Sequence, residues 1–198
     1  MGRRSDHTRE ELQELAVKAA IELLDSEGAQ GFSARKVAAK IGYTVGTLYN
    51  VFGSYDNMLL EVHARTLDEW FDFLESRLKR RGKADPLHVL AKGYVDFARA
   101  HQNRWFAMFE HVWKDGVVPD WYNEKATRPL VAAEAIILSR VGNDRRKARR
   151  AAHVLWAGIH GLCVLSLSRK LDLVESETIE TLTHSLIDNY LKGQIARK

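Results

Sequence analysis

The chain of 198 residues has one cysteine and three prolines. A single cysteine, Cys163, excludes an internal disulfide framework and is typical of proteins in a reducing cytoplasm. The sequence also has no internal repeat, no low-complexity linker, no nucleophile elbow, no Gly-rich phosphate loop and no metal-ligand signature. These absences disfavour an enzyme. We therefore predict no catalytic residue, no cofactor and no metal site.

The charge balance gives a mild preference for anionic partners. The formal net charge is +4 and the isoelectric point is near 9.2, but the position of the charges matters more than their sum. The N-terminus (MGRRSDHTREE) is polar and contains no apolar stretch of the kind that a secretory signal needs. We therefore expect a cytoplasmic protein, with residues 1–7 forming an arm that carries Arg3 and Arg4.

Two short helices joined by a tight turn are the most specific feature of the sequence. Ser33 can cap a helix over residues 34–40, because its hydroxyl accepts a hydrogen bond from a first-turn N–H. Gly42 suits the left-handed conformation that ends a helix, and Thr44 can cap a second helix over residues 45–50. This is the helix-turn-helix pattern, in which the second helix enters the major groove of DNA. Two ordinary core helices would show the same spacing.

The surroundings of these helices lack negative charge, as contact with a phosphate backbone requires. Between Gly28 and Gly53 the sequence has Arg35, Lys36 and Lys40 but no acidic residue. We expect Leu48 and Val51 to point inward. The remaining positions are candidates for contact with base edges (Thr44, Val45, Thr47, Asn50), with phosphates (Arg35, Tyr49) and for close backbone approach (Gly46).

The order of residues between positions 8 and 62 resembles the signature of the tetracycline-repressor (TetR) family of bacterial transcription regulators. The positions in register are Phe32, Val37-Ala38, Ile41-Gly42, Thr47-Leu48-Tyr49, Phe52 and Leu59. One position departs from the family pattern. Where the family has a lysine that meets a DNA phosphate, this chain has Tyr55, which can donate only a neutral hydrogen bond.

The periodicity of apolar residues predicts an all-α fold of about nine helices. Besides the helix-turn-helix pair, we expect helices from Thr8 to residues 28–31 and over residues 54–79, 86–101, 104–113, 120–140, 143–168 and 176–192. Pro129 should kink or break the helix that contains it. The resemblance implies a DNA-binding domain of residues 1–53, and a helical effector-binding and dimerisation domain of residues 54–198. It also implies a homodimer formed through the last two long helices, residues 144–169 and 176–192.

Residues 151–168 contain no Asp, Glu, Lys or Arg. A run of this length raises the alternative of a membrane span, which His153, His160 and two serines disfavour. A helix buried on several sides, partly by a second subunit, explains the run better. We therefore expect no membrane partner. Residues 156–161 also resemble the W-x-x-x-H-G element in the effector domain of many TetR-like proteins.

Large aromatic side chains are concentrated in the second half of the chain. They can form the core alone, or they can line an apolar effector pocket. The candidate effector contacts are Trp105, Phe109, Trp113, Trp121, Trp156 and His160. The sequence thus favours a ligand-responsive repressor, released from operator DNA by a hydrophobic or aromatic small molecule. The alternative is a small helical enzyme or ligand carrier that uses the pocket around His160.

Two further groups of residues have simpler explanations. His153, Trp156, His160 and Cys163 recur at helical spacing, but a metal site needs three or four convergent ligands; packed core residues are the preferred interpretation. The densest basic cluster lies between Arg145 and Arg150, outside the helix-turn-helix. We interpret this cluster as a solvated first helical turn, although cations are disfavoured near a helix N-terminus. A nucleic-acid patch is the alternative.

Overall fold

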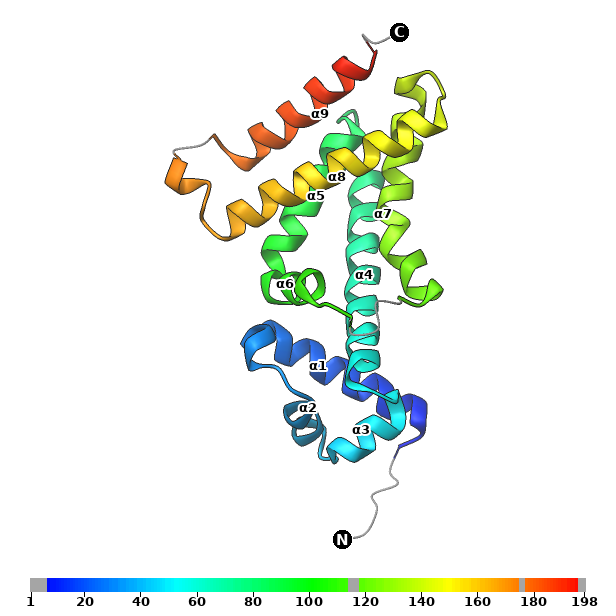
Figure 1. Cartoon of the computed structure of the whole chain (residues 1–198), viewed down its shortest axis with the longest axis vertical. Coiled ribbons are helices and arrows are strands. Elements are labelled where there is room, and N and C mark those ends of the chain that lie inside the picture. Colours follow the sequence, from blue (N-terminus) through cyan, green and yellow to red (C-terminus); the bar gives the residue numbers. More distant parts are fainter. Residues whose placement is uncertain (1–6, 114–117, 175–176, 196–198) are drawn as a thin grey trace. The chain divides into compact units, whose positions relative to one another are not determined.

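The computed structural model describes residues 7–113, 118–174 and 177–195. In these ranges every regular element is a helix, as predicted (Figure 1). The elements are α1 (Arg9–Gly31), α2 (Ala34–Ile41), α3 (Val45–Phe52), α4 (Tyr55–Lys79), α5 (Pro86–Ala100), α6 (Gln102–Glu110), α7 (Asp120–Leu138), α8 (Arg145–Leu167) and α9 (Ile179–Ile195), with short 3-10 helices at Ser139–Val141 and Asp172–Val174.

The chain forms two compact units, each made of two stretches of sequence. Unit 1 contains Met1–Asp68 and His101–Asn123, and unit 2 contains Glu69–Ala100 and Glu124–Lys198. Helices α4 and α7 each contribute to both units. Unit 1 therefore includes α6 and the first half of α4, in addition to the helix-turn-helix.

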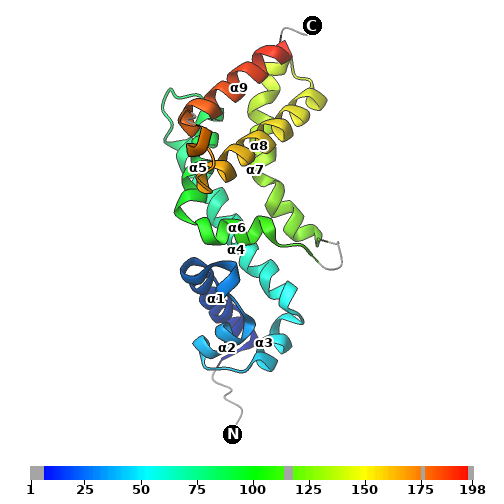
Figure 2. The ribbon, with the colours of Figure 1, turned by 60° about the vertical axis from the view of Figure 1, so that its left-hand side comes forward.

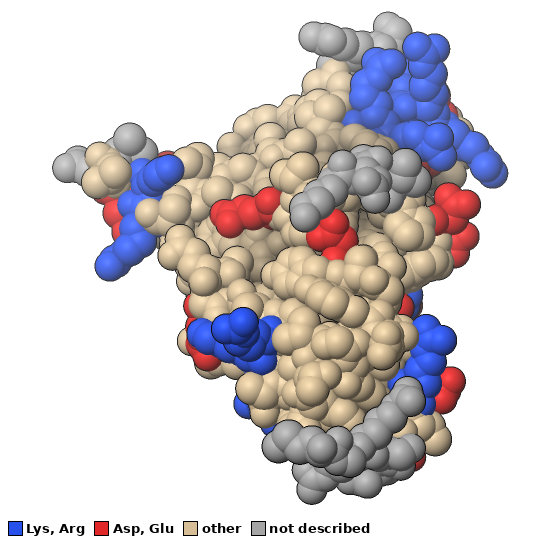
Figure 3. Space-filling view, turned by 60° about the horizontal axis from the view of Figure 1, so that its bottom comes forward, with Lys and Arg blue, Asp and Glu red and all other residues tan. Residues whose placement is uncertain are grey.

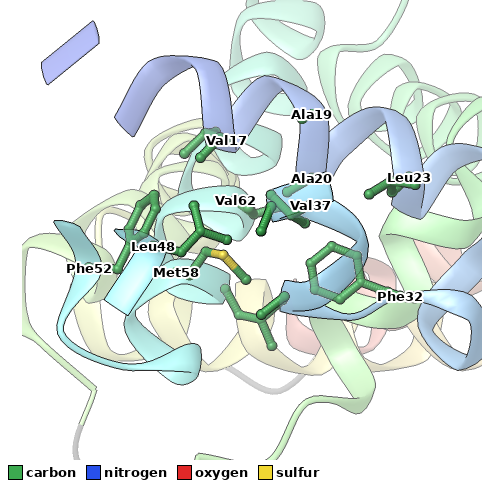
Figure 4. Close-up of a cluster of buried hydrophobic side chains, with 14 of the residues drawn as sticks. Val17, Ala19, Ala20, Leu23, Phe32, Val37, Leu48, Phe52, Met58 and Val62 are labelled. Atoms are coloured by element: carbon green, nitrogen blue, oxygen red, sulfur yellow. The ribbon is translucent and has the colours of Figure 1, made fainter. Parts of the chain in front are cut away.

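Unit 1 is built around one apolar core. Side chains of α1, α2, α3 and the start of α4 converge on Val37, Leu48 and Val62, which are fully buried (Figure 4). Leu48 and Val51 of α3 point into this core, as predicted. Burial of a large aliphatic side chain stabilises the folded state by about 1.5–3 kcal/mol, so the core fixes the orientation of α3 on α1 and α2.

The helix ends of unit 1 follow the predicted capping residues. Thr8 and Glu11 form a capping box, with distances of 2.8 Å and 3.2 Å between each side-chain oxygen and the other residue's backbone nitrogen. The Ser33 hydroxyl accepts from Lys36 N, and Gly42 is left-handed with φ of 76°. α3 extends to Phe52, two residues beyond the predicted end. These caps define the entry and exit of each helix in the helix-turn-helix.

Unit 2 is organised around the packing of α8 against α9 and α5. Figures 1 and 2 both show α8 and α9 side by side. The predicted N-cap Asp144 accepts from Lys147 N at 3.0 Å, and α8 begins at the next residue. Its buried side chains, Ala148, Ala151, Ala152, Leu155, Ile159 and Cys163, lie in the interior of unit 2. By length and composition alone α8 could also cross a membrane, a criterion that core helices meet as well.

The predictions for α6, α7 and α9 differ most from the structure. α6 ends at Glu110 rather than at Trp113, because His111 adopts an extended backbone that turns the chain away. α7 continues through Pro129, so the break considered there is absent. α9 begins at Ile179, where the Thr178 hydroxyl accepts from Thr181 N, rather than at residue 176, which lies outside the described ranges.

Candidate DNA-binding surface and aromatic clusters

The face of α3 opposite the core carries the side chains predicted to read DNA. Tyr49 is 42% exposed, and Asn50 and Thr44 are exposed as well. Val45 is less free than predicted, because its side chain is half-buried against the core of unit 1. The exposed face is polar and uncharged, which is suited to hydrogen bonds with base edges.

The N-terminal end of α3 is organised by two hydroxyl groups. Thr44 Oγ1 accepts from Thr47 N at 3.2 Å and lies 2.9 Å from Thr47 Oγ1. Gly46, between them, has no side chain to screen the backbone, and only the Thr44 hydroxyl lies near its position. A helix N-terminus attracts anions through its free N–H groups and dipole. This end of α3 can therefore approach a phosphate closely.

The C-terminal end of α3 is held by side chains from two other helices. Arg9 Nη2 of α1 donates to Val51 O at 2.8 Å, and Asn57 Nδ2 of α4 donates to Phe52 O at 3.0 Å. These donors satisfy carbonyl groups that have no partner within the helix. Arg9 and Asn57 cannot be identified from the sequence pattern, because both bonds depend on how the helices pack.

The basic residues of α2 are only partly available to a phosphate backbone. Lys40 Nζ lies 3.1 Å from Glu22 Oε2 of α1, and Lys36 pairs with Glu27 of the same helix. Arg35 is exposed and has no ion-pair or hydrogen-bond partner among the described residues. The inference of an acid-free surface is therefore wrong for α2, because the packing of α1 on α2 brings carboxylates from outside residues 28–53 to both lysines.

The space-filling view in Figure 3 shows the lysine and arginine side chains in several separate groups, with mostly uncharged surface between them. Acidic side chains lie beside several of these groups on the face shown, so part of the positive charge there is offset locally.

Two tyrosines next to the helix-turn-helix have their rings packed in unit 1. The Tyr55 ring lies 6.1 Å from that of Phe32, and burial raises the pKa of the Tyr55 phenol. Tyr43, in the turn between α2 and α3, hydrogen-bonds through its hydroxyl to His7 Nδ1 at 2.7 Å. Tyr55 is thus a neutral, half-buried residue, and any phosphate contact would use its hydroxyl alone.

Four of the predicted effector residues lie in unit 1. Trp105 is fully buried, with its ring centroid 4.8 Å from that of Phe109. The ring centroid of Trp113 lies 4.1 Å from that of His111 and 5.9 Å from that of Tyr122. Trp121 is 40% exposed and contacts Tyr122. Trp105 therefore serves as core, whereas Trp113 and Trp121 are more accessible.

A buried histidine lies beside this aromatic group. His63 of α4 is 1% exposed, and its ring is 5.9 Å from His111 and 6.1 Å from Trp113. Burial, with a smaller effect from His111, lowers the pKa of His63 to about 3. Its Nε2 has no hydrogen-bond partner among the described residues. His63 is therefore neutral at physiological pH.

The other two predicted effector residues, Trp156 and His160, lie on α8 in unit 2, with ring centroids 6.0 Å apart. Tyr94 of α5, which the sequence analysis did not single out, brings its hydroxyl to 2.6 Å from His160 Nδ1. Burial lowers the pKa of His160 and raises that of Tyr94. The Tyr94 hydroxyl accordingly forms a hydrogen bond with a neutral imidazole, whose tautomer sets which group donates. Only the three-dimensional packing distinguishes Tyr94 from the other inward-facing residues of α5.

The histidine and cysteine positions of α8 do not form a nucleophilic or metal site in the described residues. Burial raises the pKa of the Cys163 thiol to about 11, so the reactive thiolate is scarce at neutral pH. His153 points away from that environment, with an exposed ring whose Nδ1 bonds to Arg149 O. No group of three or more candidate metal ligands occurs in the described ranges.

The basic cluster at the start of α8 is exposed, as a solvated helical turn would be. Arg145, Arg146 and Arg150 are all solvent-exposed. Acidic neighbours offset part of the charge: Asp144 caps the helix, and Arg149 Nε lies 3.5 Å from Glu134 Oε2. These carboxylates explain how the cations are tolerated at a helix N-terminus.

Two curated relatives are HTH-type transcriptional regulators. One, from Mycobacterium tuberculosis, is 27% identical over 169 residues, which cover 85% of this chain and 76% of the relative. The other, YobS of Bacillus subtilis, is 27% identical over 182 residues, 91% of each protein.

Solved structures share the fold. A protein from Rhodococcus sp. RHA1 matches with a TM-score of 0.74 and 19% identity, covering 97% of this chain and 98% of that one. The transcriptional regulator FadR from Bacillus subtilis, solved in complex with stearoyl-CoA, matches with a TM-score of 0.60 and 15% identity, covering 91% and 98%.

Two family profiles match this chain. The profile of the tetR family of bacterial regulatory proteins matches residues 16–62, which contain the helix-turn-helix. The profile of the tetracyclin repressor-like C-terminal domain matches residues 87–190, more than half of the chain. The chain therefore belongs to the TetR family of DNA-binding transcriptional regulators.

Proposed function

We propose that this regulator is a repressor whose α3 reads an operator in the major groove. The exposed face of α3 supports this proposal most directly, because Thr44, Thr47 and Asn50 have hydrogen-bonding groups there and Leu48 anchors the opposite face. Asn is a good partner for adenine, since its amide can donate and accept at the same base edge. Val45 would contribute an apolar contact, and the Gly46 backbone would lie close to the DNA.

Phosphate contacts would position α3 on the duplex. Arg35 is the strongest candidate, because it is exposed and no described residue neutralises it. Tyr49 is the second candidate, since 42% of its surface is exposed beside the same groove-facing residues. Tyr55 would add at most one neutral hydrogen bond. These contacts fix register and carry little sequence information.

Binding assays with two variants separate these roles. Fluorescence anisotropy would be measured with a duplex from the upstream region of the protein's own gene, and with a scrambled duplex. Asn50→Ala should weaken binding to the first duplex by about 1–3 kcal/mol and leave the second unchanged. Arg35→Ala should weaken both and reduce the salt dependence. Equal affinity of the wild-type protein for both duplexes would contradict a sequence-specific repressor.

The family's regulators bind DNA as dimers, and we propose that α8 and α9 (within residues 144–169 and 176–192) form the interface here. Exposed apolar side chains on α8, Val154 and Leu165, support this choice. The Val154→Asp/Leu165→Asp variant should be monomeric in sedimentation analysis and should lose operator binding. A dimer that survives both charges would place the interface elsewhere.

Regulators of this family respond to small molecules, and we propose a hydrophobic or aromatic effector. The aromatic clusters at Trp113 and Trp121 in unit 1 and at Trp156 and His160 in unit 2 support this class. FadR from Bacillus subtilis, a solved structure with the same fold, holds stearoyl-CoA, and such a ligand agrees with an apolar effector. A thermal-shift screen of such compounds, followed by tests of DNA release, would identify it. We also propose that residues 1–53 form the DNA-binding domain and that residues 54–198 form the effector-binding and dimerisation domain.

We also propose that the protein is cytoplasmic, has no membrane partner and is not an enzyme. The cytoplasmic location and the lack of a membrane partner are supported by the family, whose regulators are soluble DNA-binding proteins. The raised pKa of the Cys163 thiol disfavours the alternative of a helical enzyme that uses the pocket around His160. The enzyme or carrier alternative would be favoured if cells with Asn50→Ala kept the wild-type phenotype and cells with His160→Ala lost it.

A further inference from the structure

A groove of about 310 Å³ lies beside the C-terminal end of α3 and is lined entirely by residues of unit 1. Arg9 and Gln13 of α1 form one part of the lining, Asn57 and Glu61 of α4 another, and Trp121 at the start of α7 a third. Small-molecule sites in proteins start at about this volume. The groove is thus large enough for a ligand with one aromatic ring.

The groove shares residues with the support of the recognition helix. Arg9 and Asn57, which line it, donate to Val51 O and Phe52 O, the carbonyl groups at the end of α3. Val51 and Phe52 also belong to the lining. A molecule bound here would therefore touch the groups that hold α3 in place.

The chemistry of the lining favours a cation with a ring. The Glu61 carboxylate has no hydrogen-bond or ion-pair partner among the described residues, and 40% of the Trp121 surface is exposed. A cation near an indole face is attracted by the ring quadrupole, and the C-terminal end of α3 adds partial negative charge. Arg9 keeps its positive charge while its Nη2 donates to Val51 O. The preference for a cation therefore comes from the Glu61 carboxylate and the Trp121 ring rather than from the net charge of the lining.

We propose that this groove binds a small protonated arylalkylamine, with its ammonium group at Glu61 and its ring against Trp121. Gln13 and Asn57 provide amide oxygens for the remaining ammonium protons. The site is separate in its residues from the aromatic cluster of Tyr94, Trp156 and His160 in unit 2. It would allow a ligand to act on the recognition helix from within unit 1.

Isothermal titration calorimetry on the full chain with phenethylamine tests the proposal, with 3-phenylpropionate as the anionic analogue of similar size. Phenethylamine should bind, and 3-phenylpropionate should bind about tenfold more weakly because Glu61 repels it. Trp121→Ala should raise the Kd for phenethylamine about tenfold. Glu61→Gln, which keeps the shape of the side chain, should raise it about threefold.

Glu10→Gln on α1, which removes an exposed carboxylate of unit 1 that does not line the groove, is the matched control and should leave the Kd unchanged. Circular dichroism of each variant verifies that the helices are intact, and Glu61→Gln keeps the test valid if Trp121→Ala fails to fold. Three results would overturn the proposal: no binding of phenethylamine, equal binding of the anion, or a Kd that Glu61→Gln leaves unchanged. A Kd that Glu10→Gln raises as much as Glu61→Gln would likewise overturn it, because the effect would then not be specific to Glu61.

Discussion

Lys40 Nζ of α2 lies 3.1 Å from Glu22 Oε2 of α1, so a lysine placed to meet DNA already has an anionic partner within the protein. The neighbouring pair of Lys36 and Glu27 repeats the arrangement one turn earlier on α2. All four side chains are well exposed, and such pairs contribute only about 0–1 kcal/mol each. A phosphate can therefore compete for both lysines, at the cost of releasing the carboxylates.

Removing the two carboxylates should strengthen DNA binding. In the Glu22→Gln/Glu27→Gln variant, Lys36 and Lys40 no longer have to leave an ion pair, so affinity at low salt should rise about threefold. The slope of log affinity against log salt should also steepen, because more counterions are released. Glu110→Gln on α6 removes one charge from the same unit and is the control. Unchanged affinity in the double variant would mean that the lysines do not approach phosphate.

His63 should make stability fall in mild acid. Its pKa is about 3 in the folded chain, against about 6.5 in the unfolded chain, so between these values the unfolded state binds more protons. The free energy of unfolding is therefore fully retained above pH 6.5. It should fall by about 1.4 kcal/mol per pH unit below that value. Urea unfolding at pH 7.5, 6.0 and 5.0 measures it.

The matched variant for this pH dependence is His63→Leu, which places an apolar side chain at this buried position and removes the titrating group. Carboxylates titrate in both proteins, so the relevant quantity is the difference in their pH profiles. The variant should lose less stability than the wild-type protein between pH 7.5 and 5.0. Parallel profiles would show that His63 remains accessible to protons in the folded state.

The Arg104–Asp25 pair should matter for the stability of unit 1. The Arg104 side chain is 4% exposed, and its Nε donates to Asp25 Oδ1 at 2.8 Å. Asn103 Nδ2 also donates to Asp25 O, so α6 is fastened to α1 at this point. Asp25→Ala removes the carboxylate from a guanidinium that is itself buried and should cost about 1–2 kcal/mol, less than for a fully buried pair because Asp25 is 41% exposed and Arg104 Nη2 also bonds to His101 Nδ1. Chemical denaturation measures the loss in free energy of unfolding. The control is Glu14→Ala, which breaks the exposed pair of Glu14 with Arg65. A smaller loss in Asp25→Ala than in Glu14→Ala would contradict the prediction.

Tyr94→Phe should weaken unit 2 without changing its shape. The substitution removes one hydroxyl, which forms a hydrogen bond with His160 Nδ1 at 2.6 Å in a largely buried environment. Loss of this bond should cost about 1 kcal/mol, and it removes one hydrogen-bonding partner of the imidazole nitrogen. The pKa of His160, followed by NMR, should also change. An unaltered His160 titration would show that the bond is not formed in solution.

The local features of this protein were readable from the sequence. The caps at Thr8, Ser33, Thr44 and Asp144 depend on groups three residues apart, so spacing alone determines them. The inward positions of α3 follow from helical periodicity in the same way. The fold class and the family also followed from these local patterns and their order.

The tertiary structure decided which side chains far apart in sequence meet. The pairing of Lys40 with Glu22, the support of Val51 O by Arg9, and the bond between Tyr94 and His160 join different helices, and no local spacing encodes them. The end of α6 before Trp113 is also set by the chain's turn at His111. Periodicity fixes which face of a helix is buried. Only packing fixes what each face touches, and here that packing sets which charges remain free for DNA.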